Sequence, residues 1–158
     1  MDSAFAVESK PLITDIPEFE KLLSSDPSLI EIIDLLYIYK DEKSAASAKE
    51  LLEEAELFEG LHPLIFLDNG RAGENFFDYG FKGEKGVYLF KDLLIAFYLV
   101  GDDPAQIKMA TLQIEEHLVF AATHTAHELL FVEFHLSSLI NGIATAYECV
   151  PRFLVLDK

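Results

Sequence analysis

The stretch Pro63–Gly101, PLIFLDNGRAGENFFDYGFKGEKGVYLFKDLLIAFYLVG, decides the expected fold because it contains most of the chain's glycines and its longest apolar runs. Glycines that separate short runs of β-forming residues are typical of hairpins. Asn69-Gly70 suits a tight two-residue turn, and Gly83-Glu84-Lys85-Gly86 suits a slightly longer loop. We therefore predict a small antiparallel sheet in this stretch. Its expected strands are Leu64–Leu67, Phe76–Phe81, Val87–Phe90 and Leu93–Val100.

Three helices are expected before this sheet. Asp15 as N-cap, with Pro17 in the first turn, predicts a short helix that ends near Ser24. A second helix is predicted over residues 25–39, and it should be largely buried because apolar residues cover most of its circumference. Apolar residues then recur at helical spacing until Gly60, which predicts the third helix.

The remaining segments give mixed signals. Residues 1–12 have no clean period and are expected to form a loose arm. Asp102-Asp103-Pro104 predicts the start of a helix over residues 105–116. Residues 119–136 fit both a helix and a strand, and we favour a helix. Residues 150–156 suit an edge strand with a proline near its beginning.

The expected fold class is therefore α+β, with N-terminal helices packed on a small antiparallel sheet and a long C-terminal helical segment. The arm over residues 1–12 would precede a single domain over residues 13–158, a length that can bury a substantial core.

The net charge of −16 is the strongest global signal, and most of the excess acid precedes Pro63. Such a field repels nucleic-acid phosphates and anionic lipid and attracts basic proteins. The longest uninterrupted apolar run is too short to span a membrane. The chain opens with no export signal and contains a single cysteine, so a cytoplasmic location is expected.

An acidic helix face with almost no compensating lysine is the main candidate binding surface. Like charges three and four residues apart destabilise a helix unless positively charged groups neutralise them. Acidic and aromatic residues of the sheet region extend the expected partner-binding set. The set is Glu50, Glu53, Glu54, Glu56, Glu59, Asp68, Glu74, Phe76, Phe77, Asp78, Tyr79 and Glu84.

A metal site is the weaker alternative. If residues 105–148 were one helix, His117, His124, Glu128 and His135 would share one stripe, and His124 with Glu128 could clamp an ion. His117 and His135 would then lie too far apart to share that ion. We therefore expect no metal and no cofactor. No catalytic residue is assigned, because Cys149 lies in a largely apolar stretch and is expected to be a buried, inert thiol.

Two families resemble parts of the chain. PLIFLDNG, ENFFDYG and GVYLF, together with the segment Ala110–Leu118, resemble the core of the SUKH superfamily, whose bacterial members are mostly immunity proteins that neutralise toxins. GEKGVYLFKDLLIAFYLVGD is similar to a strand of ADP-ribosyltransferase folds, with Gly86, Tyr88 and Ala96 at the matching positions. The catalytic glutamate which that second resemblance implies would be Glu128 or Glu133.

The expected function is that of a non-enzymatic acidic binding protein, most specifically an immunity-type inhibitor of a basic toxin or effector. An acidic secretion chaperone, which would also bind its partner through negative charge, is one alternative. An ADP-ribosyltransferase-like protein or a metal-binding protein is the other. The sequence leaves open whether the protein forms a homodimer.

Overall fold

The computed structural model describes residues 1–124 and 126–156, with the side chain of His124 excluded. These residues form two antiparallel sheets, of six and five strands, and the chain divides into two compact units. Unit 1 comprises Met1–Phe66 and Lys82–Tyr88, and unit 2 comprises Leu67–Phe81 and Leu89–Lys158. The expected arrangement, N-terminal helices on one small sheet followed by a long C-terminal helical segment, is therefore wrong, although the protein is α+β.

Unit 1 is built on the element sequence β-α-β-β-α-β. In the larger sheet its strands follow the order β2-β3-β1-β4, and each neighbouring pair among these four is antiparallel. This is the order of a split β-α-β, or ferredoxin-like, arrangement. The elements are β1 (Asp2–Ser9), η1 (Pro11–Asp15), α1 (Pro17–Ser24), β2 (Leu29–Ile33), β3 (Leu36–Tyr39), α2 (Glu42–Glu54) and β4 (Phe58–Leu67).

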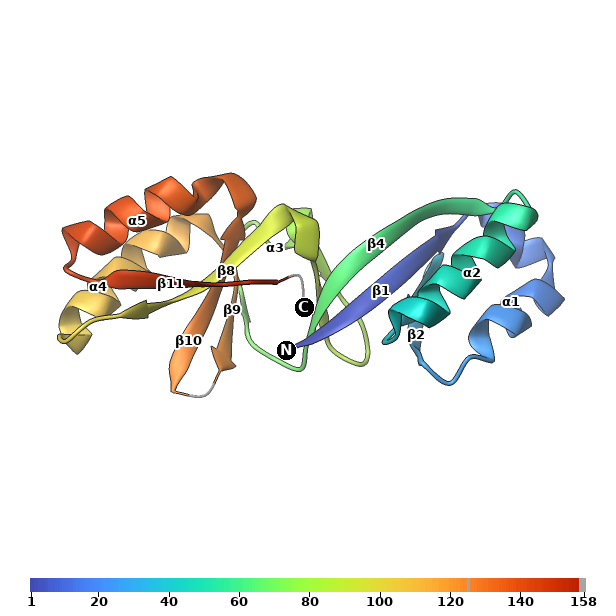
Figure 1. Cartoon of the computed structure of the whole chain (residues 1–158), viewed down its shortest axis with the longest axis horizontal. Helices are drawn as coiled ribbons and strands as arrows, with labels where there is room; N and C mark the ends of the chain where they lie inside the picture. The colour runs from blue at the N-terminus through green and yellow to red at the C-terminus, as the bar shows by residue number, and fades with distance from the viewer. Residues whose placement is uncertain (125, 157–158) are drawn as a thin grey trace. The chain divides into compact units, whose positions relative to one another are not determined.

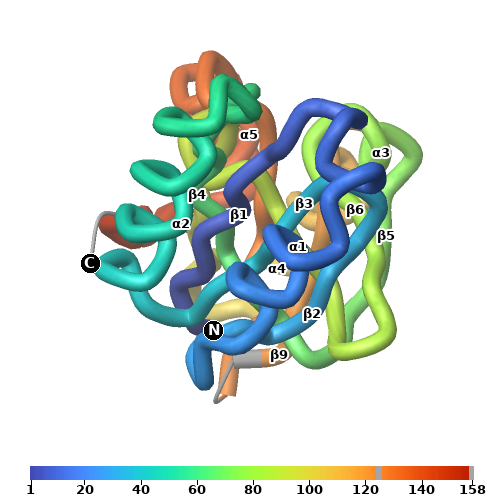
Figure 2. Tube along the Cα trace, turned by 90° about the vertical axis from the view of Figure 1, so that its right-hand side faces the viewer, coloured from blue at the N-terminus to red at the C-terminus, as the bar shows by residue number. Residues whose placement is uncertain are grey.

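Helices α1 and α2 lie on the same side of β1 and β3, as Figures 1 and 2 show. Val7 of β1 and Tyr37 and Tyr39 of β3 pack with the apolar residues of both helices to form the core of this unit. The Tyr39 hydroxyl also donates a hydrogen bond of 2.8 Å to the carbonyl of Leu23, which ties β3 to the end of α1.

Strands β7 (Val87–Phe90) and β6 (Gly80–Lys82) follow β4 in the order of the larger sheet. The loop between them, residues 83–86, is closed by a hydrogen bond of 2.9 Å from the Gly83 amide to the Gly86 carbonyl. The loop expected at Gly83-Glu84-Lys85-Gly86 is thus confirmed.

Unit 2 repeats the same element order. Its strands follow the order β11-β8-β10-β9, again antiparallel throughout, with the short β5 beside β9. The elements are β5 (Arg71–Ala72), α3 (Phe76–Tyr79), η2 (Lys91–Leu93), β8 (Leu94–Val100), α4 (Pro104–Ile114), η3 (Glu115–His117), β9 (Leu118–His124), β10 (His127–Glu133), η4 (Phe134–Leu136), α5 (Ser137–Ala146) and β11 (Val150–Leu154).

Helices α4 and α5 lie together on one face of the smaller sheet (Figure 1). Phe97 of β8, Leu130 of β10, Ile114 of α4 and Ile140 of α5 belong to one buried cluster. The chain is therefore a tandem of two β-α-β-β-α-β units, a repeat that the sequence analysis did not detect.

Two of the expected helices are β-hairpins. Residues 29–39 form β2 and β3, joined at Asp34, which has a φ of 52°. Residues 118–124 and 127–133 form β9 and β10. The sequence predicts both hairpins as helices because their apolar runs are nearly continuous. Most of β3, β9 and β10 is buried, whereas β2 is only half-buried and its Ile32 is 44% exposed.

The expected loose arm is a strand at the centre of unit 1. β1 lies between β3 and β4, and Ala4, Ala6 and Val7 are fully buried. The strand expected at Phe76–Phe81 is instead the short helix α3 followed by β6. Asp15 does not cap α1, whose N-cap is Ile16 with no side-chain hydrogen bond.

Several single elements are confirmed. Helices α1 and α4 lie where the sequence predicts helices, and strands β7, β8 and β11 lie where it predicts strands. The third expected helix is α2, but it ends at Glu54 instead of near Gly60, where β4 has already begun. The Asp103 carboxylate accepts a hydrogen bond of 2.9 Å from the Ala105 amide, which is the expected N-cap of α4.

Candidate functional sites

The acidic residues expected to bind a partner surround the C-terminal half of α2. Asp41 begins the helix as N-cap by accepting a hydrogen bond from the Lys43 amide. Ala45, Ala48 and Leu52 of α2 are buried in the core of unit 1, so the intervening residues face outward. We call the exposed glutamates of this region the acidic segment: Glu50, Glu53, Glu54, Glu56 and Glu59. Only the first three lie in α2; Glu56 follows the helix and Glu59 lies in β4, so the expected helix face of five glutamates is wrong in part.

The acidic segment has few neutralising partners. None of the ion pairs found within residues 1–124 and 126–156 involves its five glutamates. Lys49 lies nearby in sequence, but its ammonium group is 5.4 Å from the centre of the Phe58 ring, where it makes a cation–π contact. Glu56 follows the helix with a φ of 59°, which turns the chain so that Leu57 is buried.

The other residues of the expected partner-binding set do not form one described surface with the acidic segment. Glu84 belongs to unit 1, whereas Asp68, Glu74 and the whole of α3 belong to unit 2. Phe76 is fully buried with its ring centre 5.8 Å from that of Phe120. Phe77 is 75% exposed, and Asp78 is exposed beside it.

A carboxylate clamp in unit 1 was missed by the sequence analysis. The carboxylate of Glu31 accepts hydrogen bonds from the Glu84 amide (3.0 Å), the Lys85 amide (3.2 Å) and the Tyr88 hydroxyl (2.5 Å). It therefore fixes the loop between β6 and β7 against β2. The available signal was a single acid within the apolar run of residues 29–33.

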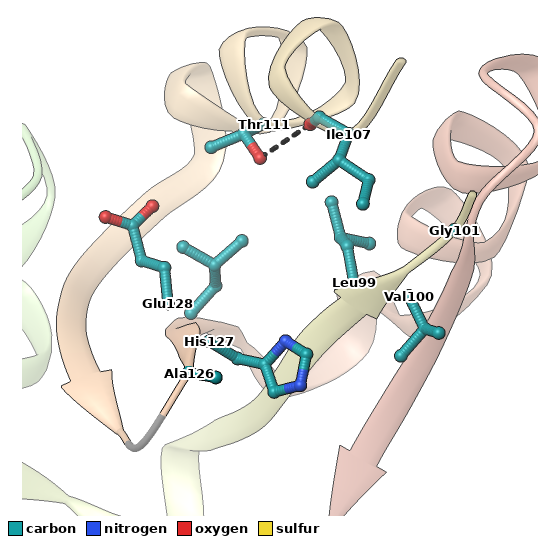
Figure 3. Close-up of a pocket in the computed structure, with 9 residues that line it drawn as sticks. Leu99, Val100, Gly101, Ile107, Thr111, Ala126, His127 and Glu128 are labelled. Atoms are coloured by element: carbon teal, nitrogen blue, oxygen red, sulfur yellow. Dashed lines mark hydrogen bonds between the residues drawn. The ribbon is translucent and has the colours of Figure 1, made fainter. Parts of the chain in front are cut away.

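A pocket in unit 2 was also missed. It has a volume of about 240 Å³ and lies between α4 and the ends of β8 and β10. Figure 3 shows Thr111 and Ile107 of α4 on one side, His127 on the opposite side, and Leu99 and Glu128 flanking the space between them. Leu130, Val100, Gly101 and Ala126 complete the lining.

Polar groups beside this pocket are already partly engaged. The Thr111 hydroxyl donates a hydrogen bond of 2.8 Å to the Ile107 carbonyl. His127 stacks on Tyr98 with 4.6 Å between the ring centres. The Arg71 guanidinium donates to the Glu115 carboxylate at 2.7 Å, and this bond raises the pKa of Arg71, which therefore stays charged.

Neither metal ligation nor thiol chemistry is assembled by these residues. His117 lies in η3, Glu128 in β10 and His135 in η4, so the helical stripe does not exist. The side chain of His124 lies outside the described part of the chain, and within that part no three metal-ligating side chains gather. Burial raises the pKa of the Cys149 thiol, so this group is held in its unreactive protonated form.

A scan of protein-family models, a search of curated proteins and a search of solved structures each return no match. Across residues 1–124 and 126–156 no helix combines the length and apolar character that a membrane-spanning helix requires.

Proposed function

We propose that this chain is a non-enzymatic binding protein whose acidic segment receives a basic protein partner. The observation that carries the proposal is the set of five exposed glutamates at 50–59 for which the described residues provide no ion-pair partner. An immunity-type inhibitor of a basic toxin or effector is the most specific form of the proposal.

The arrangement of α2 supports this use. Glu50, Glu53 and Glu54 are three and four residues apart on a helix whose buried face fixes their direction. Their mutual repulsion costs a few tenths of a kcal/mol for each pair, and a lysine or arginine surface would relieve it. The net charge of −16 would also accelerate the approach of a basic partner.

The test uses the purified chain as bait in an extract of its native cells. The wild type is compared with a variant carrying Glu50→Gln, Glu53→Gln and Glu54→Gln. A matched variant, Asp92→Asn, Asp102→Asn and Glu116→Gln, removes the same charge from exposed positions of unit 2. We expect one stoichiometric basic protein on the wild type and on the matched variant, with its retention lost from the first variant.

Equal retention by all three baits would show that the acidic segment is not the contact. Retention of no basic protein by the wild type would contradict the proposed function itself.

A further inference from the structure

Two of the polar side chains that line the pocket of unit 2, Thr111 and Glu128, act as hydrogen-bond acceptors, and a third, His127, stacks on Tyr98. The hydrogen of the Thr111 hydroxyl is already donated to the Ile107 carbonyl, while its oxygen faces the pocket (Figure 3). Its free lone pairs can therefore only accept. Glu128 contributes a carboxylate, which has no hydrogen to donate when ionised. A ligand that satisfies both groups must supply N–H or O–H donors.

The charge beside the pocket is negative. Arg71 lies between two carboxylates, with its guanidinium 2.7 Å from an oxygen of Glu115 and 3.6 Å from an oxygen of Glu128. A carboxylate has two oxygens with about four lone-pair sites, so Glu128 retains capacity to accept beside its contact with Arg71. Among Arg71, Glu115 and Glu128, two carboxylates and one guanidinium leave one negative charge uncompensated, which favours a cation over an anion beside Glu128.

The remaining walls are apolar. Leu99, Ile107 and Leu130 line the pocket, and Leu99 and Leu130 are almost fully buried. For comparison, an apolar cavity of about 150 Å³ accommodates benzene. The volume of about 240 Å³ found here is therefore sufficient for a short hydrocarbon chain.

We propose that this pocket binds a small protonated primary alkylamine. The alkyl chain lies against Leu99, Ile107 and Leu130, and the ammonium group donates to the Thr111 hydroxyl and the Glu128 carboxylate. The proposal is independent of the acidic segment, because that segment belongs to unit 1 and the pocket to unit 2.

The test is a titration of the full-length chain with n-butylammonium chloride, followed by the methyl NMR signals of Leu99, Ile107 and Leu130. Dissociation constants in the millimolar range are expected, because a ligand of this size has few atoms that can contribute. n-Butyrate and n-butanol have the same alkyl chain with a negative charge or none. We expect the methyl shifts to saturate with the amine and to be weak or absent with the other two.

Two variants test the polar contacts. Glu128→Gln keeps the shape and removes the charge, and it should weaken n-butylammonium binding about threefold to fivefold, the effect typical of a half-exposed ion pair. Thr111→Val removes the hydroxyl oxygen from α4 and should also weaken binding, and it keeps the test valid if Glu128→Gln disturbs β10. Glu116→Gln, an exposed residue that does not line the pocket, is the charge control and should leave affinity unchanged.

Three results would overturn the proposal. They are binding of butyrate or butanol as tight as that of the amine, an effect of Glu116→Gln as large as that of Glu128→Gln, and the absence of shifts at the three pocket residues. None of these outcomes bears on partner capture by the acidic segment.

Discussion

Glu31 shows how a single residue determines a loop conformation in this protein. Its carboxylate accepts two amide hydrogen bonds and the hydroxyl of Tyr88, all from the segment that follows β6. Hydrogen bonds to a charged acceptor contribute more than neutral ones, so the clamp should contribute measurably to stability.

The clamp predicts energetic coupling between Glu31 and Tyr88. Tyr88→Phe should lower the free energy of unfolding by about 1–3 kcal/mol, because it removes one bond to the carboxylate. In the Glu31→Gln background, Tyr88→Phe should lower the free energy of unfolding by about 1 kcal/mol less than it does in the wild type. Urea unfolding of the two single variants and the double variant measures the difference. Additive effects would mean that the hydroxyl and the carboxylate do not stabilise each other.

Alanine substitution at two glycines should change the free energy of unfolding in opposite directions. A Cβ at Gly83 would overlap the Glu31 carboxylate and the Ile33 side chain, so Gly83→Ala should displace the clamp and lower the free energy of unfolding. Gly142 is exposed within α5 and a Cβ there would meet nothing within 4 Å. Gly142→Ala should therefore raise the free energy of unfolding by about 0.5–1 kcal/mol. Urea unfolding of both variants checks the two signs, and Gly83→Ala without loss of stability would contradict the clamp geometry.

Buried tyrosines predict a loss of stability in alkali. Burial raises the pKa of Tyr39 and, together with the bond to Glu31, that of Tyr88, above the ordinary value of 10.0. Above that pH the unfolded chain loses phenolic protons that the folded chain keeps, so stability falls as pH rises. Melting temperatures across this range should decline less steeply in Tyr88→Phe than in the wild type. Equal slopes would argue against a raised pKa for Tyr88.

At the scale of elements, β1 is a strand in a segment expected to be a loose arm. It lies between β3 and β4, and its Ala6 is fully buried. Ala6→Asp would bury an unpaired charge and should cost about 3 kcal/mol or more. Lys10→Asp, an exposed change just after the strand, should cost little. Chemical denaturation of both variants measures the two changes in the free energy of unfolding. If residues 1–12 were a loose arm, both changes would be small.

The elements that the sequence could predict are those with local signals. The cap at Asp103 and the turn glycines at 83 and 86 act within a few residues, and α4 and the loop before β7 lie where expected. The hairpins of residues 29–39 and of residues 118–124 with 127–133 depend on long-range strand pairing, which no local pattern reveals. Their β-branched and aromatic residues, such as Ile32, Tyr37 and Phe131, were the signal that favoured strands.

The candidate sites were predictable to different degrees. The exposure of Glu50, Glu53 and Glu54 follows from the helical period that buries Ala48 and Leu52, whereas Glu56 and Glu59 lie beyond the end of α2 and do not follow that period. The pocket of unit 2 requires Thr111 and Glu128 to meet across α4 and β10, a long-range arrangement that depends on the hairpin the sequence analysis read as a helix.

At the scale of the whole molecule, one element order occurs twice, with strand orders β2-β3-β1-β4 and β9-β10-β8-β11. The surface chemistry of the two units differs. Unit 1 has the acidic segment, whereas unit 2 has a small pocket beside an arginine that contacts two carboxylates. Two occurrences of the same scaffold thus present different candidate sites.

The central claim is that the acidic segment receives a basic protein, and the association rate constant of the captured partner tests it most directly. For the wild type we expect this rate constant to fall about tenfold or more between low and physiological ionic strength, because salt screens the attraction. Glu50→Gln, Glu53→Gln and Glu54→Gln together should reduce both the low-salt rate and its salt dependence. A rate constant that neither salt nor these substitutions change would contradict the account.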